Sequence, residues 1–124
     1  MADVATKKVL DNERIAVWEL VLEPGEETGL HTHQHSYMLY VIEGSEIDNL
    51  DADGNSLGAV NAEPGLAVFF QLVAGQLFYD GNRVPATHNA KNIGDSRYRE
   101  VLVEIKKAST ALQCMAWRAI CCWL

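Results

Sequence analysis

Apolar and polar residues alternate with a period of two along most of the chain. The segment RIAVWELVLE (14–23) is rich in Val, Ile, Leu and Trp and ends at PGEETG, which predicts a strand followed by a turn. Residues 30–44 begin with polar alternation, become apolar and stop at a glycine. Residues 97–106 alternate Tyr98, Val101, Val103 and Ile105 with charged side chains, so we expect a further strand there.

Turn signals separate these apolar segments. Asp-Gly within DADGN (51–55) indicates a hairpin, and Pro-Gly closes the short strand expected at 56–65. Residues 66–75 and 76–82 predict two more strands, and Gly-Asp (94–95) ends the segment that follows. Short strands at this spacing are typical of an antiparallel sandwich or barrel, and 124 residues favour one domain, which we assign to residues 1–107.

Residues 108–124 form an apolar C-terminal tail of a different character. Apolar residues recur at helical spacing, at Leu112, at Met115 or Ala116, and at Ala119 or Ile120, so a short helix packed on the sheet or in a subunit contact is expected. The alternative is an end that is atypical of the fold. All three cysteines (Cys114, Cys121, Cys122) lie in this tail, which does not resemble a disulfide framework.

Charge restricts the class of partner. The net charge of −7 argues against nucleic acid and against an anionic membrane surface, and no segment is long and apolar enough to span a bilayer. The first 18 residues lack the apolar run of a secretory signal. We therefore expect a cytoplasmic, soluble protein whose partner is a small molecule or a protein.

Three of the four histidines lie at alternate positions in HTHQHSY (31–37). Alternate residues of a strand share a face, so His31, His33 and His35 are expected on one side, followed by Tyr37 if no bulge intervenes. Neutral imidazole is a common ligand for zinc, iron, copper and nickel, and less readily for manganese. His31 and His33 can hold one ion from one strand, and His88 is the only histidine elsewhere. The alternative is a set of hydrogen-bonded histidines without metal.

PGEETGLHTHQHSYMLYVIEG (24–44) resembles the first conserved motif of the cupin superfamily. Gly25 matches its first glycine, His31 and His33 its His-x-His pair, and Gly44 its last glycine. HNAKN (88–92) resembles the end of the second motif. The resemblance covers about residues 14–107. It implies an all-β, double-stranded β-barrel of the cupin jelly-roll type, often dimeric, with His31, His33 and His88 around one divalent metal in the interior.

The sequence departs from this family pattern at two places. Tyr37 stands where the first motif has a glutamate ligand, and His35 is the alternative candidate for a fourth ligand or a pocket residue. The second motif lacks its usual Pro-x-Gly; Pro85 falls near the glycine position and Gly75 lies further upstream. A three-nitrogen set suits Zn, Ni, Fe or Cu and leaves open positions, which catalysis requires.

Other residues are candidates to line a pocket, although an aromatic side chain on a sheet is more often part of the core. The candidates are Tyr79, Phe69, Phe70, Phe78, Tyr40 and Met38. Arg83 is either a carboxylate-binding group or an exposed turn residue, and Gln76 is an unusual polar residue beside the second motif. Asn89, Asn92 and backbone carbonyls are candidates to hold the far nitrogens of the imidazoles.

Two functions follow from the resemblance. The first is a metal-dependent enzyme, of dioxygenase, isomerase, decarboxylase or lyase type, that acts on a small carboxylated molecule, with Tyr37 or His35 as extra ligand or acid–base group. The second is a non-catalytic module that binds a small ligand. A third option is a metal-free barrel. A homodimer is expected in each case.

Overall fold

The computed structural model describes residues 1–107, which form eleven strands and no helix. One antiparallel sheet has seven strands, in the order β1 (Lys7–Asp11), β2 (Ile15–Leu22), β11 (Tyr98–Ile105), β4 (Ser36–Glu43), β7 (Ala67–Val73), β8 (Gln76–Tyr79) and β9 (Asn82–Pro85). The second has four, in the order β3 (His31–Thr32), β10 (Thr87–Asn92), β5 (Ser45–Leu50) and β6 (Ser56–Ala62).

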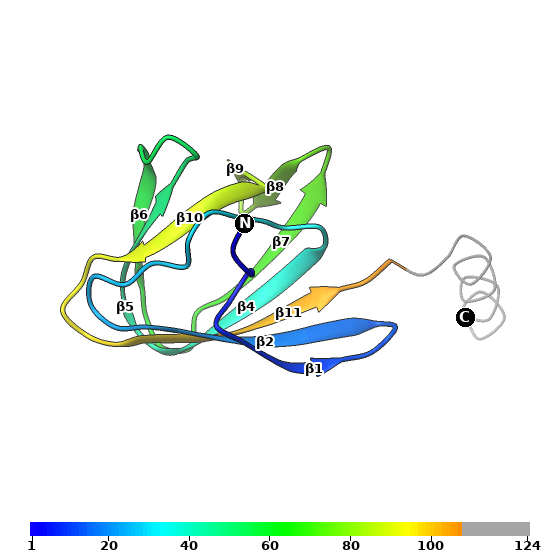
Figure 1. Cartoon of the computed structure of the whole chain (residues 1–124), viewed down its shortest axis with the longest axis horizontal. Helices are drawn as coiled ribbons and strands as arrows, with labels where there is room; N and C mark the ends of the chain where they lie inside the picture. Colours follow the sequence, from blue (N-terminus) through cyan, green and yellow to red (C-terminus); the bar gives the residue numbers. More distant parts are fainter. Residues whose placement is uncertain (108–124) are drawn as a thin grey trace, which may run out of the picture.

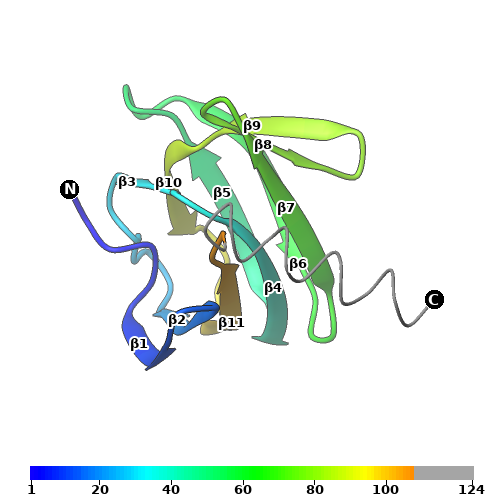
Figure 2. The same ribbon diagram turned by 90° about the vertical axis from the view of Figure 1, so that its right-hand side faces the viewer.

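The two sheets face each other as in a jelly roll, with β5, β6 and β10 opposite the larger sheet (Figures 1 and 2). Segments far apart in sequence are paired: β11 lies between β2 and β4, and β10 lies between β3 and β5. The prediction of an all-β fold of the jelly-roll type is confirmed. The predicted tail, residues 108–124, lies outside the described residues, and the domain boundary at 107 stays a prediction.

The period-two alternation of β2 shows how the sequence produces this arrangement. Ala16, Trp18, Leu20 and Leu22 are buried between the sheets, and the residues between them are half-buried on the outer side. Removing these apolar side chains from water stabilises the fold by roughly 25 cal/mol per Å² of buried surface. The predicted hairpin at 51–55 is confirmed as the turn between β5 and β6.

The inward face of β11 is not the one that its Val and Ile residues suggest. Tyr98, Glu100, Leu102 and Glu104 are buried, whereas Val101 and Val103 are half-buried on the other face. Two glutamates therefore occupy interior positions. Because a carboxyl group is costly to bury, this inversion of the usual pattern indicates that the interior needs polar groups at this strand.

The histidine-rich segment is interrupted rather than continuous. β3 ends at Thr32 and β4 begins at Ser36, and residues 33–35 carry the chain from the smaller sheet to the larger one. His31, His33 and Tyr37 are buried, and His35 is only half-buried. The expected sharing of one face therefore does not extend to His35.

Gly44 joins β4 to β5 where the chain crosses between the sheets. A Cβ atom at this position would lie 2.8 Å from Cδ of Pro64 and in contact with the backbone oxygen of Ala62. Gly25 adopts φ +87° in the turn after β2, a conformation that side chains disfavour. Both glycines of the first motif are therefore required by the backbone: Gly44 for the close approach of residues 62–64, and Gly25 for its positive φ.

The outer face of the larger sheet carries a row of apolar side chains. Register pairs align Val17 with Val103, Val103 with Met38, and Met38 with Phe69, which is 55% exposed. The expected homodimer stays a prediction, as does the cytoplasmic location. Among the described residues, no helix has the length and apolar character needed to cross a bilayer.

Candidate metal centre

Three histidines from two separate segments meet in the interior. His31 on β3 and His88 on β10 are register partners, and His33 follows β3 directly. The ring centroids of His31 lie 4.8 Å from those of both His33 and His88, and the rings of His33 and His88 are 4.9 Å apart. All three side chains are at least 94% buried, and one nitrogen from each lies within 4.8 Å of the others. The predicted set His31, His33 and His88 is therefore brought together.

Backbone carbonyls fix the orientation of two of these rings. Nδ1 of His31 lies 2.8 Å from the oxygen of Gly29, and Nδ1 of His88 lies 2.8 Å from the oxygen of Pro85. A carbonyl oxygen only accepts, so both Nδ1 atoms carry the proton and donate. Each ring therefore presents the lone pair of its Nε2 atom, which is the form that ligates a metal.

Burial keeps all three imidazoles neutral at physiological pH. Desolvation lowers the pKa of His31, and it lowers the pKa of His33 to about 2, with His88 and His31 as further causes. Desolvation, followed by the neighbouring His31, lowers the pKa of His88 to about 4. Because only the neutral ring has a lone pair to share, this environment favours ligation.

The hydrogen bonds of this cluster are incomplete in a way that suits a cation. Nε2 of His33 lies 3.1 Å from Nε2 of His31. His31 and His88 each present a lone pair on Nε2, and the single ring proton of His33 can be donated to only one of them. Nδ1 of His33 is buried and has no partner among residues 1–107. An ion with nitrogen bonds of roughly 2.0–2.1 Å holds its ligand atoms a little over 3 Å apart, which this spacing approaches. The residues present therefore fit a divalent metal.

Thr28 supports His31 from behind. Its Oγ1 lies 3.1 Å from Nδ1 of His31 and 3.1 Å from Oδ1 of Asn89, and it accepts a hydrogen bond from the backbone N–H of Ala90. Asn89, one of the predicted supporting residues, thus contacts Thr28, and Thr28 in turn contacts the imidazole of His31. The backbone carbonyls expected in this role are those of Gly29 and Pro85.

Asn92 is structural and does not hydrogen-bond to an imidazole. It is fully buried, and its side-chain nitrogen donates to the backbone oxygens of Leu22 and Ser96 at 2.9 and 2.8 Å. Its oxygen accepts from Oγ of Ser45 at 2.8 Å and from the N–H of Gly94 at 3.0 Å. The prediction that Asn92 holds the far nitrogen of an imidazole is wrong, because all of its hydrogen-bonding capacity is used to tie three segments together.

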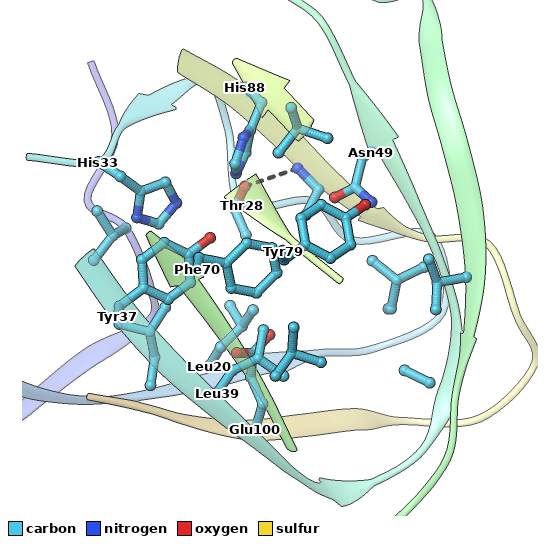
Figure 3. A pocket seen from close by; sticks show the side chains of 18 of the residues that line it. Leu20, Thr28, His33, Tyr37, Leu39, Asn49, Phe70, Tyr79, His88 and Glu100 are labelled. Atoms are coloured by element: carbon cyan, nitrogen blue, oxygen red, sulfur yellow. Dashed lines mark hydrogen bonds between the residues drawn. The ribbon is translucent and has the colours of Figure 1, made fainter. Parts of the chain in front are cut away.

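A row of stacked rings leads away from the histidines. The ring of Tyr37 stacks on His33 with centroids 4.3 Å apart, Phe70 stacks on Tyr37 at 4.7 Å, and Tyr79 tilts against Phe70 at 4.6 Å (Figure 3). Burial raises the pKa of Tyr37 well above its ordinary value, with Glu100 as the next cause, so its phenol is neutral. Tyr37 thus lies at the predicted position but presents a ring face to His33.

This row forms one wall of a cavity of about 120 Å³ between the two sheets. Figure 3 shows His33 and His88 at one end of it and Glu100 at the other, and His31 contacts both of these histidines. The remaining walls are mainly apolar and come from both sheets: Leu20, Leu39, Ile47, Val60, Val68, Val84, Ala90 and Leu102. The site is therefore a small apolar chamber with nitrogen ligands at one end.

Several predicted residues lie away from this chamber. His35 lines a separate, open pocket on the surface together with Trp18 and Glu104. Among the proposed pocket residues, Phe70 and Tyr79 line the cavity; Phe69, Phe78 and Tyr40 are exposed, and Met38 is on the outer face of the sheet. Arg83 is exposed, and neither it nor Gln76 lines the cavity.

Sequence reasoning missed four polar residues that line the cavity: Thr28, Asn49, Tyr98 and Glu100. Thr28 and Asn49 carry no sequence signal that separates them from ordinary surface residues. Tyr98 and Glu100 share a face of β11 with Leu102, since residues two apart on a strand do so, but Val101, Val103 and Ile105 favour the opposite face as the buried one.

The chain was compared with protein families, curated proteins and solved structures. No protein-family model matches the sequence, and no curated protein matches it significantly. A cupin domain from Bordetella pertussis Tohama I matches with a TM-score of 0.61 and 25% identity, over 82% of this chain and 91% of that one.

Two structures of named activity match more distantly. A sugar phosphate isomerase of the cupin superfamily from Silicibacter pomeroyi matches with a TM-score of 0.50 and 20% identity, over 76% of this chain and 52% of its own length. The polyketide cyclase RemF from Streptomyces resistomycificus matches with a TM-score of 0.52 and 21% identity, over 82% of this chain and 63% of its own length. At this identity the likeness concerns the fold.

Proposed function

The chain is a small protein of the cupin superfamily, and from this premise we propose that it is a metal-dependent enzyme acting on a small carboxylated organic molecule. The observation that carries this proposal is the convergence of three neutral, buried imidazoles at one end of an internal cavity. A structural metal site is closed by four protein ligands, whereas three nitrogens leave positions for a substrate.

The three histidines would hold a divalent transition metal, with Zn, Fe, Ni, Cu and Mn as candidates. Such a metal supplies Lewis-acid character toward a carboxylate or carbonyl oxygen. The chain's own contribution is positional: the carbonyls of Gly29 and Pro85 hold two rings in the ligating tautomer. The walls are mainly apolar, and such an environment strengthens electrostatic contacts with a bound anion.

An isomerase, lyase, decarboxylase or dioxygenase would use a proton-transfer group beside the metal, and Tyr37 is the better of the two predicted candidates. Its ring contacts His33, and its neutral phenol can donate a hydrogen bond. His35 lines a different pocket. The solved structures with the same fold include an isomerase and a cyclase, which agrees with a catalytic cupin without identifying the reaction here.

The test is metal stoichiometry. The full chain, purified without a histidine tag, is expected to bind one equivalent of zinc, as measured by elemental analysis after dialysis. His31→Ala and His88→Ala should each lower the affinity at least 100-fold, whereas His35→Ala serves as the matched control and should bind as the wild type does. Retention of zinc by both His31→Ala and His88→Ala would exclude the assigned site.

A second function, a ligand-binding module without catalysis, is favoured by one observation. The position where the cupin motif has a carboxylate ligand is occupied by Tyr37, whose phenol is neutral and stacked on His33. Such a module would bind small carboxylates, seen as a rise in melting temperature, and would release them unchanged. Product analysis by mass spectrometry after incubation with the bound acid distinguishes the two functions.

A further inference from the structure

The end of the cavity away from the histidines contains a buried carboxyl group. Figure 3 shows Glu100, on β11, beside Leu20 and Leu39 and on the opposite side of the cavity from His33 and His88. Its side chain is 94% buried. Oε1 accepts a hydrogen bond from the hydroxyl of Tyr98 at 3.0 Å, whereas Oε2 has no partner among residues 1–107.

A buried oxygen without a partner is costly, and proteins rarely keep one without a function. Burial raises the pKa of Glu100 to about 7, so the side chain carries its proton much of the time near neutral pH. Since Oε1 accepts from Tyr98, the acid proton belongs on Oε2, and Oε2 can then donate a hydrogen bond into the cavity.

The other buried glutamate of β11 provides an internal comparison. Glu104 is also 94% buried on the same face of the strand, but Nε1 of Trp18 donates to its Oε1 at 2.6 Å. Glu104 does not line the cavity. The buried acid that lies away from the cavity, Glu104, has a hydrogen-bond donor. The acid that lines the cavity, Glu100, has an oxygen without one.

The space between the two ends sets the shape of a ligand. The rings of Tyr37, Phe70 and Tyr79 form a flat apolar wall, and the cavity of about 120 Å³ is close to the roughly 150 Å³ that accommodates benzene. A short molecule with an apolar middle fits this space. Polar contacts are then available at its two ends.

We propose that Glu100 is a second binding point of the cavity, where Oε2 donates a hydrogen bond to a carbonyl or hydroxyl oxygen of a ligand whose carboxylate lies at the histidines. This inference rests on the proposed function, which places a carboxylate at the metal end. It narrows the substrate class to short oxo acids and hydroxy acids. Glu100 is then a residue that determines specificity.

The experiment compares two acids that differ by one carbonyl oxygen. Levulinate and pentanoate are titrated calorimetrically into the zinc-loaded full chain, and levulinate is expected to bind about tenfold more tightly. Glu100→Gln keeps a neutral donor and should retain most of this preference, whereas Glu100→Leu should abolish it. Glu104→Gln is the matched control and should show the wild-type ratio.

An infrared measurement provides a readout that a purely structural role would not change. The carbonyl stretch of the protonated carboxyl should be present in the wild type, absent in Glu100→Gln, and shifted by levulinate but not by pentanoate. A levulinate preference that survives in Glu100→Leu, or an unshifted band, overturns the inference and leaves the proposed function standing. Failure of both acids to bind the zinc-loaded wild type contradicts the proposed function itself.

Discussion

The ring of Tyr37 lies flat against the ring of His33, with centroids 4.3 Å apart and planes inclined by 19°. His33 is the one histidine of the cluster whose Nδ1 has no hydrogen-bond partner among residues 1–107. The stack therefore provides for His33 what the carbonyls of Gly29 and Pro85 provide for the other two rings. Because Tyr37 covers only a face of the His33 ring, the stack would leave the ring nitrogens of His33 free to hold a metal.

Tyr37→Phe is accordingly expected to bind zinc within about threefold of the wild type, because phenylalanine preserves the stack. Tyr37→Ala removes the ring and should weaken zinc binding by about tenfold or more, as loss of ligand orientation usually does. Competition with a chromophoric chelator measures both affinities. A loss of two orders of magnitude in Tyr37→Phe would instead identify the phenol oxygen as a ligand.

Thr28 is expected to tune the centre through His31. Thr28→Val removes the hydroxyl that lies 3.1 Å from Nδ1 of His31 and should lower zinc affinity by about tenfold. Thr28→Ser retains the hydroxyl and should stay close to the wild type. The same chelator competition applies, with circular dichroism to check folding. Equal affinities for the valine and serine variants would remove Thr28 from the support of the metal centre.

The cluster of three histidines was predictable from sequence because short-range geometry fixes most of it. The His-x-His spacing at the end of β3 keeps His31 and His33 close together, and the pairing of β10 with β3 brings His88 to the same point. His35 was not predictable in this way, because the break between β3 and β4 depends on where the chain crosses to the other sheet. That crossing is set by tertiary pairing of β4 with β11 and β7.

The interior glutamates illustrate a different limit. A pattern of alternating Val and charged residues normally assigns the valines to the core, and on β11 this rule gives the wrong face. The outer valines instead belong to the apolar row across the larger sheet. Strand periodicity and turn signals thus predict the fold. The position of Glu100 at one end of the cavity can be recognised only when strand register and burial are known.

Asn92 is predicted to be a major determinant of stability with no part in metal binding. Asn92→Ala leaves two backbone oxygens, one hydroxyl and one N–H without their partner, so we expect a loss of about 2–4 kcal/mol. Urea denaturation measures this loss. The exposed Asn61→Ala should change stability by less than about 0.5 kcal/mol. A similar small change in Asn92→Ala would show that the network relaxes without cost.

Glu100 should make the stability of the protein depend on pH. Its pKa is raised from 4.5 to about 7, so the folded protein binds more protons than the unfolded chain between these values. The stabilisation of the folded state is therefore lost as pH rises from about 5 to about 8. The shift corresponds to a difference on the order of 3 kcal/mol between the two ends of that range.

Glu100→Gln removes this titration, so its stability relative to the wild type should increase between pH 5 and pH 8. Urea denaturation of the metal-free proteins at both pH values measures it. The buried histidines, whose pKa values are lowered, contribute a trend of opposite sign, but that trend is common to both proteins and cancels in the difference. An unchanged difference between pH 5 and pH 8 would show that Glu100 does not titrate in this range, and its Oε2 would then be an ionised acceptor rather than a donor.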